Sequence, residues 1–169
     1  AGLDRPTGGE IMVSGARVTG PGADRGMVFQ EYALLPWKTT QANIEFGLRL
    51  KGVAREERAR VARRFIDMVG LTGFENKYPH QLSGGMRQRA AVARVLANNP
   101  TVLLMDEPFA AVDAMTRQRL QEELAIIATT ERTTVLFVTH AIDEAVFLSD
   151  RVVALSGRPG RIVADIDID

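Results

Sequence analysis

The spacing of apolar and polar residues changes along the chain, and these changes predict its secondary structure. Near the start, the segments from Glu10 to Val18 and from Gly26 to Phe29 place β-branched and apolar residues between glycine-rich turns, as short strands do. From Thr40 to about Asn98 the pattern becomes helical, because apolar residues such as Val61 and Phe65 recur at helical spacing. We therefore expect β-structure followed by a helical insert.

After Pro100 the predicted strands and helices alternate. Two continuous apolar runs, Thr101 to Met105 and Thr134 to Val138, are typical of strands that are covered on both faces. The helix expected between them carries Leu120, Leu124 and Ile127 on one side. Three further elements are expected: a helix from Ala141 to Leu148, a strand from Arg151 to Leu155, and, after a turn at Gly157 to Gly160, a strand from Arg161 to Ile168. This alternation predicts an α/β fold with a parallel sheet and helices outside it.

Composition narrows the classes of function. The 169 residues are 46% hydrophobic, enough for one domain with a sizeable core. Because 21 Lys and Arg balance 21 Asp and Glu, no net charge draws the chain to nucleic acid or to an anionic bilayer, and we expect no nucleic-acid partner. The absence of cysteine excludes disulfides and thiolate metal sites, and it fits a reducing cytosolic setting. No apolar run approaches the roughly 20 residues that span a bilayer.

Two adjacent carboxylates, Asp106 and Glu107, follow the apolar run that ends at Met105. They fall at the carboxyl end of a predicted buried strand, where open α/β sheets bind their ligands. One acid in such a position can hold Mg²⁺ through water, while its neighbour polarises an attacking water. Asp106 is thus the metal candidate and Glu107 the candidate base. From this motif alone, the alternative of two acids that simply end a strand before a turn stays open.

The segment from Leu82 to Arg89 places a serine and two glycines at the start of a predicted helix. Unpaired helix N–H groups favour an anion there, and glycine removes the Cβ that would block close approach. Ser83 could cap the helix or bond to a phosphate oxygen. The alternative is an ordinary Ser-Gly-Gly turn, which is common in proteins.

Together these stretches resemble a known family. Leu82 to Arg89 reads LSGGMRQR and Thr101 to Pro108 reads TVLLMDEP, and they look like the signature motif and the Walker B strand of ABC-transporter ATPases. Three more segments look like that family's Q-loop, D-loop and switch-histidine strand: Gly26 to Gln30, Ala110 to Asp113, and Val135 to His140. The resemblance implies an ABC-ATPase fold, which is a RecA-like α/β core of the P-loop NTPase class with a helical subdomain. Residues 1–39 and 99–169 would form the core and β segments, and residues 40–98 the helical subdomain with the signature motif.

The resemblance also implies a mechanism shared between two copies, with ATP and Mg²⁺ as cofactors. Each ATP would lie between the Walker motifs of one subunit and the signature motif of the other. Ser83, Gly84 and Gly85 would grip the γ-phosphate of the partner's nucleotide. Asp106 and Gln30 would serve Mg²⁺, and Glu107 would orient the attacking water.

Three further residues enter the nucleotide site only through the resemblance. His140 would contact the γ-phosphate, and Gln88 and Asp113 would belong to the same site. Without the family context, His140 would be read as a hydrogen-bonded structural histidine, Gln30 as a strand-end polar residue and Asp113 as a helix cap. His80 is read as structural and is not placed in the site.

The sequence departs from the family at the phosphate loop. That loop needs Gly-x-x-x-x-Gly-Lys-Ser/Thr, and no such string occurs in these residues. The three lysines are Lys38, Lys51 and Lys77, and none follows a glycine in such a loop. In the family the loop lies just before the phrase that resembles Ala1 to Glu10, so we expect a truncation before that point. We then expect weak or no ATP hydrolysis by this chain alone, and exposed apolar surface that invites association.

Two segments resemble one subgroup of the family, the importers of nitrate, sulfonates, taurine or bicarbonate: Gln30 to Trp37 and Ser156 to Ile162. The resemblance implies an energy-coupling subunit of an importer for a small anionic solute, peripheral on the cytoplasmic face of the membrane. Its partners would be a second ATPase subunit and the membrane permease subunits. The apolar residues from Leu34 to Trp37 would contact a permease helix, or would be buried within the domain.

Two other functions remain open at this point. The first is a loop-less binding module that pairs with an intact ABC ATPase and contributes only its signature surface. The second is a soluble ABC ATPase of translation or DNA repair. The second is disfavoured because such proteins usually carry tandem cassettes or long coiled-coil insertions, and 169 residues contain neither.

Overall fold

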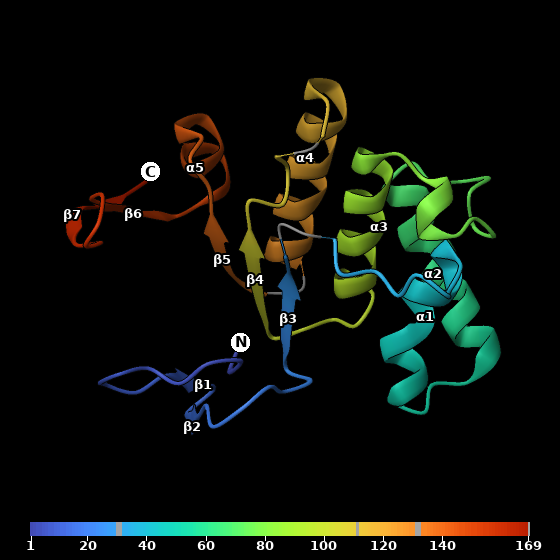
Figure 1. Cartoon of the computed structure of the whole chain (residues 1–169), viewed down its shortest axis with the longest axis horizontal. Coiled ribbons are helices and arrows are strands. Elements are labelled where there is room, and N and C mark those ends of the chain that lie inside the picture. The colour runs from blue at the N-terminus through green and yellow to red at the C-terminus, as the bar shows by residue number, and fades with distance from the viewer. Residues whose placement is uncertain (30–31, 111, 131–132, 169) are drawn as a thin grey trace.

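A three-stranded parallel sheet forms the centre of the computed structural model, which describes residues 1–29, 32–110, 112–130 and 133–168 (Figure 1). Its strands are β3 (Arg25–Val28), β4 (Val102–Asp106) and β5 (Thr134–Val138), in the order β3, β4, β5. Leu104 in the central strand lies opposite Met27 on one side and Leu136 on the other. The expectation of an α/β fold with a parallel sheet is therefore confirmed.

The helical insert packs beside β3 and contains α1, α2, the short 3-10 helix η1 and α3 (Figure 1). Their bounds are Thr40–Leu50, Arg55–Met68, Pro79–Gln81 and Gly84–Leu96. Helix α3 lies against β3, where a Cβ on Gly26 would come within 2.4 Å of Val95 Cγ1. Glycine at this position therefore permits the close approach of strand and helix.

The long helix α4 (Ala114–Thr130) connects β4 to β5. Leu120 and Leu124 are buried in the same apolar cluster as the strand residues Leu103 and Met105. The side chain of Ile127, expected on the same helical face, lies outside the part of the chain that the structure describes. Helix α4 therefore packs on the core as the crossover helix between two parallel strands.

The N-terminal β-structure is a two-stranded hairpin, β1 (Met12–Val13) with β2 (Ala16–Arg17). The single strand expected from Glu10 to Val18 is wrong. Ser14 and Gly15 have φ values of 49° and 77°, the left-handed geometry of a tight hairpin turn. The chain therefore reverses in the middle of the predicted strand.

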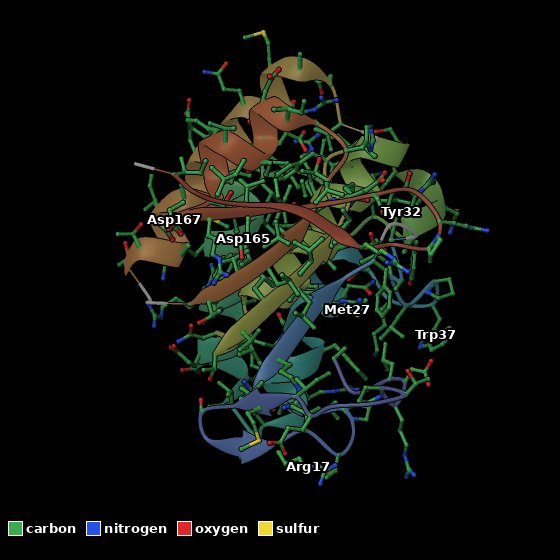
Figure 2. All side chains as sticks on the ribbon, turned by 90° about the vertical axis from the view of Figure 1, so that its left-hand side faces the viewer. Arg17, Met27, Tyr32, Trp37, Asp165 and Asp167 are labelled. Carbon is green, nitrogen blue, oxygen red and sulfur yellow. The ribbon has the colours of Figure 1, made fainter. Side chains whose placement is uncertain are left out.

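At the other end, the short helix α5 (Ile142–Leu148) leads into a second hairpin, β6 (Arg151–Leu155) with β7 (Ile162–Asp167). Asp165, labelled in Figure 2, pairs with Arg151 across the two strands at 2.6 Å. The turn expected at residues 157–160 joins them.

The expectation that Thr134 to Val138 is covered on both faces is wrong. Leu136 and Val138 are 60% and 52% exposed, and only β4 hydrogen-bonds to β5 among the described strands. Exposure continues over the neighbouring elements, on Ile142, Val146, Phe147, Val153, Leu155, Ile162, Val163 and Ile166. A continuous apolar run predicted the strand correctly but not its surroundings.

No helix within the described ranges combines the length and the apolar character that a membrane crossing requires.

Candidate functional site at the carboxyl end of the sheet

The two carboxylates lie where the parallel strands end. Asp106 is the last residue of β4 and is exposed, and Glu107 follows it. The Glu107 backbone N–H donates to the Val138 carbonyl at 2.9 Å, which ties the end of β4 to the end of β5. Glu107 has a φ of 44°, a left-handed conformation that a residue other than glycine rarely adopts.

His140 approaches Glu107 from the loop after β5. Its Nδ1 lies 3.1 Å from Glu107 Oε1, and the His140 side chain is 78% exposed while that of Glu107 is 29% exposed. A carboxylate can only accept, so a hydrogen bond across this distance would use an imidazole proton on Nδ1. The second ring nitrogen, Nε2, then remains for another partner. The structure thus brings together a base candidate and a histidine that are 33 positions apart in sequence.

The Ser-Gly-Gly segment forms the first turn of α3. Ser83 is the N-cap, and its Oγ accepts from the Met86 backbone N–H at 3.3 Å. Gly84 and Gly85 are the first residues of the helix, and helix N–H groups at this end lack partners within the helix. Figure 1 shows this end of α3 at the same end of the molecule as the carboxyl ends of the strands. The arrangement can bind an anion.

Tyr32, which the sequence did not single out, lies against this turn. Its hydroxyl is 3.2 Å from the position that a Cβ on Gly84 would occupy, and the Arg87 guanidinium is 5.2 Å from the Tyr32 ring centroid. The Arg94 side chain also donates to the Ala33 carbonyl at 2.8 Å. Tyr32 and Ala33 are therefore held against α3 by these contacts.

The remaining predicted site residues have different surroundings. Gln88 is only 1% exposed, so its side chain does not reach the surface on which Ser83 lies. Asp113 is exposed and accepts from the Thr116 N–H at 3.1 Å at the start of α4. This backbone hydrogen bond is the main cause that holds the pKa of Asp113 below its ordinary value. Gln30 lies outside the described residues.

The segment from Leu34 to Trp37, which was expected to contact a permease helix, is hydrogen-bonded to Asn43 and partly exposed to solvent. The fully buried Asn43 accepts from the Leu35 N–H at 2.8 Å, and its amide group donates to the carbonyls of Leu35, Lys38 and Thr39. Leu34 packs against the core, whereas Trp37 is 71% exposed and lies at the periphery of the molecule in Figure 2. Of the two alternatives for this segment, burial within the domain applies to Leu34, and contact with a permease stays a prediction for the exposed Trp37.

Within the described ranges, no cluster of three or more His, Cys, Asp or Glu side chains could enclose a metal ion. Mg²⁺ at nucleotide sites is usually held by one or two carboxylates together with phosphate oxygens and water. An exposed Asp106 at a strand end fits that donor set. The residues present therefore suit a magnesium ion that arrives with a nucleotide.

A network behind His140 was also missed in the sequence. The Thr139 hydroxyl donates to Glu144 Oε2 at 2.7 Å, and Arg117 Nη1 lies 3.8 Å from Glu144 Oε1. The position of Glu144 within a predicted short helix could have indicated that this acid faces the protein. Nothing in the spacing indicated that Arg117, from a different helix, would meet it.

Residues 1–110 match the family described as ABC transporter. The whole chain is 60% identical to an uncharacterized ABC transporter ATP-binding protein of Methanocaldococcus jannaschii, and covers 63% of that protein. It is 54% identical to the nitrate import ATP-binding protein NrtD of Synechocystis sp., of which it covers 64%. Over 161 residues it is 50% identical to the taurine import ATP-binding protein TauB of Rhizobium johnstonii, of which it covers 62%. The chain thus spans somewhat less than two thirds of the length of these relatives.

Two solved structures share the fold. A dimeric structure of the bacterial ABC transporter cassette MJ0796 superimposes with a TM-score of 0.90 at 33% identity, over 99% of this chain and 76% of that one. A second dimeric structure of MJ0796, in a post-hydrolysis state with ADP and Pi, gives a TM-score of 0.87 at the same identity and coverage.

Proposed function

This chain belongs to the ABC transporter family, and from that premise we propose that it is the ATP-binding, energy-coupling part of an importer for a small anionic solute. The relatives named for nitrate import and for taurine import support the solute class, because nitrate is an anion and taurine carries an anionic sulfonate group. The solute itself is selected by other subunits, so no residue of this chain is assigned to it.

The contact between His140 Nδ1 and Glu107 Oε1 is the observation that carries this proposal. In it, Glu107 orients and polarises the water that attacks the γ-phosphate. His140, held through Nδ1, uses Nε2 toward a phosphate oxygen, and it can donate there when the ring is protonated. Asp106, next to Glu107 at the strand end, is the residue that would hold Mg²⁺. The metal would neutralise phosphate charge when bound.

The nucleotide site is proposed to be shared between two subunits. Ser83, Gly84 and Gly85 offer the N-terminal turn of α3 to the γ-phosphate of a nucleotide on the partner, and Asp113 lies beside the same interface. Gln30, which lies outside the described residues, is proposed to serve Mg²⁺. Gln88 is buried within α3, so we propose no direct contact between its side chain and the nucleotide. The dimeric state of the structural neighbours supports this division of the site.

The membrane partners of the proposed importer are permease subunits, which places the protein on the cytoplasmic face of the membrane. The exposed Trp37 and Pro36 form the contact that we propose for a permease helix. These residues are presented on a segment that Asn43 fixes from behind.

The lysine-bearing phosphate loop does not occur in these 169 residues. We therefore propose that this chain alone binds Mg-ATP weakly and does not turn it over, since no lysine neutralises the phosphates. Calorimetric titration with Mg-ATP and a phosphate-release assay test this directly. Tight binding with turnover that Glu107→Gln abolishes would contradict it.

A chimera tests the roles of the carboxylates. The segment of the Synechocystis relative that contains its phosphate loop is fused ahead of Ala1, and hydrolysis is measured. We expect turnover that Glu107→Gln lowers by at least about a hundredfold while Mg-ATP binding persists. Turnover that survives in Glu107→Gln would overturn the assignment of Glu107.

A mixing experiment separates the proposed function from that of a loop-less module. An intact relative whose own signature serine is replaced by arginine is mixed with this chain. If this chain supplies only a signature surface, hydrolysis returns on mixing, is lost with Ser83→Arg, and is unaffected by Glu107→Gln. An absence of any rescue would contradict the role as a loop-less module.

A further inference from the structure

Glu144 is unusual among the described side chains because it is both buried and ionisable. The buried polar residues are Thr40, Asn43, Gln88 and Glu144, and of these only Glu144 can carry a charge. Removing a carboxylate from water is costly unless hydrogen bonds or a counter-charge replace its hydration. A buried acid next to a functional loop therefore needs a structural reason.

The partners of Glu144 come from two other elements. The hydroxyl of Thr139, at the end of β5, donates to Oε2 at 2.7 Å. Arg117, in the first turns of α4, brings Nη1 to 3.8 Å from Oε1 and donates from Nη2 to the Val112 carbonyl at 3.0 Å. The carboxylate thus connects the end of β5 to the segment that begins α4.

The same network fixes the turn that contains His140. Thr139 Oγ1 accepts from the Ala141 backbone N–H at 3.0 Å while it donates to Glu144. His140 lies between these two residues, and its own side chain is 78% exposed, so packing against neighbours restrains it little. The position of its ring therefore depends on how firmly the residues on either side are held.

We propose that Glu144 is a positioning residue, which holds the Thr139–Ala141 turn against α4 so that His140 Nδ1 stays within hydrogen-bond distance of Glu107. The positioning role rests on the contacts of Glu144 with Thr139 and Arg117. Its catalytic consequence rests on the proposed function, in which Glu107 and His140 act on the γ-phosphate. In addition, Arg117 contacts both Glu144 and the Val112 carbonyl, so the network connects the Thr139–Ala141 turn to the segment just before α4, which lies beside the proposed subunit interface.

A purely local role for Glu144 makes a different prediction. An acid in the first turn of a helix is favoured by the helix dipole wherever it lies, and it would stabilise α5 without affecting His140. The two roles are separated by measuring the ring of His140 and the fold separately.

The chain offers an internal reference, because its two histidines are His80 and His140. Nitrogen-15 spectra of both rings are recorded at a fixed pH of about 8, where an unperturbed imidazole is neutral. Amide hydrogen exchange is followed at Ala141, in the turn, and at Leu104, in the central strand. The variants are Glu144→Ala, Glu144→Gln, Thr139→Val and Thr139→Ser.

We expect Glu144→Ala and Thr139→Val to shift the ring signals of His140, to leave those of His80 in place, and to speed exchange at Ala141 about tenfold relative to Leu104. Glu144→Gln, which still accepts from Thr139, and Thr139→Ser, which still donates, should restore the original spectrum. Thr139→Val provides the answer if Glu144→Ala does not fold. Unchanged His140 signals, or equal acceleration at Ala141 and Leu104, would overturn the proposal.

The chimera with a phosphate loop adds the catalytic readout. Glu144→Ala should lower kcat about ten- to a hundredfold with KM for Mg-ATP unchanged, since only the positioning of the histidine is lost. An unchanged kcat together with shifted His140 signals would overturn the catalytic consequence. If the unsubstituted chimera shows no turnover, the proposed function fails, whereas the spectra still decide the role of Glu144.

Discussion

The helical insert and the β5–β7 region differ in how far their apolar side chains are exposed to solvent. In the insert, Ile44, Ile66 and Leu71 are at most 1% exposed. In the β5–β7 region, Leu136 and Ile162 are 60% and 66% exposed. Three consecutive helices can cover one another's apolar faces, whereas a strand needs other elements beside it and above it. The comparison teaches that an apolar pattern can specify an element without specifying what surrounds it.

The same substitution in the two regions should produce the largest difference. Ile66→Ala removes a fully buried side chain and should lower the free energy of unfolding by about 2–5 kcal/mol. Ile162→Ala removes one that is 66% exposed and should change it by less than about 0.5 kcal/mol. Urea denaturation of both variants measures the contrast. Equal losses would mean that the exposed face is packed in solution.

A polar core residue of the insert should have the next largest effect. Asn43→Ala leaves the Leu35 N–H and the Lys38 carbonyl without their partner, while the carbonyls of Leu35 and Thr39 keep a backbone N–H donor; the free energy of unfolding should fall by about 1–3 kcal/mol. Asn76→Ala, at an exposed position, is the matched control and should have little effect. Denaturation midpoints compare the two, and similar midpoints would contradict the role given to Asn43.

The exposed strand face should affect association more than stability. Leu136→Lys places a charge on β5, and edge strands with charged residues associate less. We expect less oligomer at high protein concentration by sedimentation velocity, with the free energy of unfolding changed by less than about 0.5 kcal/mol. Met115→Lys, at an 86% exposed position on α4, controls for added charge. Equal effects of the two lysines would show that β5 is not the surface responsible.

The smallest effect concerns the ion pair of the β6–β7 hairpin. The hydrogen bonds from Arg151 hold the pKa of Asp165 below its ordinary value. The ionised carboxylate therefore stabilises the hairpin fully at pH values above the ordinary pKa of an aspartate. This stabilisation is lost as the pH falls through the lowered pKa of Asp165. Asp165→Asn should slightly reduce the stability difference between pH 7 and about pH 3. Because both groups are exposed, the change should be small.

A double variant checks the origin of that pH dependence. Arg151→Gln alone should reduce it as much as Asp165→Asn, and combining the two should add nothing further. Additive effects would assign the pH dependence to other carboxylates.

Local signals predicted most of the fold. The bounds of β5 and β6 agree with their apolar runs, because hairpin and loop residues end both runs abruptly. The turn at Ser14 and Gly15 was missed, although a Ser-Gly pair between apolar residues is a recognised turn signal. Exposed apolar surface was expected from the missing phosphate loop, but its position at Leu136 could not be predicted, since that depends on which elements lie beside β5.

The candidate site divides in the same way. Asp106 and Ser83 could be found because each stands at the end of an element that its own neighbours in sequence define. The contact of His140 with Glu107, and that of Arg117 with Glu144, join separate segments, and no local spacing contains that information. The family resemblance suggested the first pair. The second emerged only from the packing of α4 against α5.

The left-handed backbone at Glu107 has a consequence for how this site persists through evolution. A residue with a Cβ is strained at a φ of 44°, at a cost of about 1–3 kcal/mol, whereas glycine or asparagine adopts that conformation more easily. Replacement of Glu107 by either residue should therefore make the chain more stable while removing the proposed base. Selection for stability alone would therefore not favour this acid, and its retention would need a benefit such as the chemistry proposed for it.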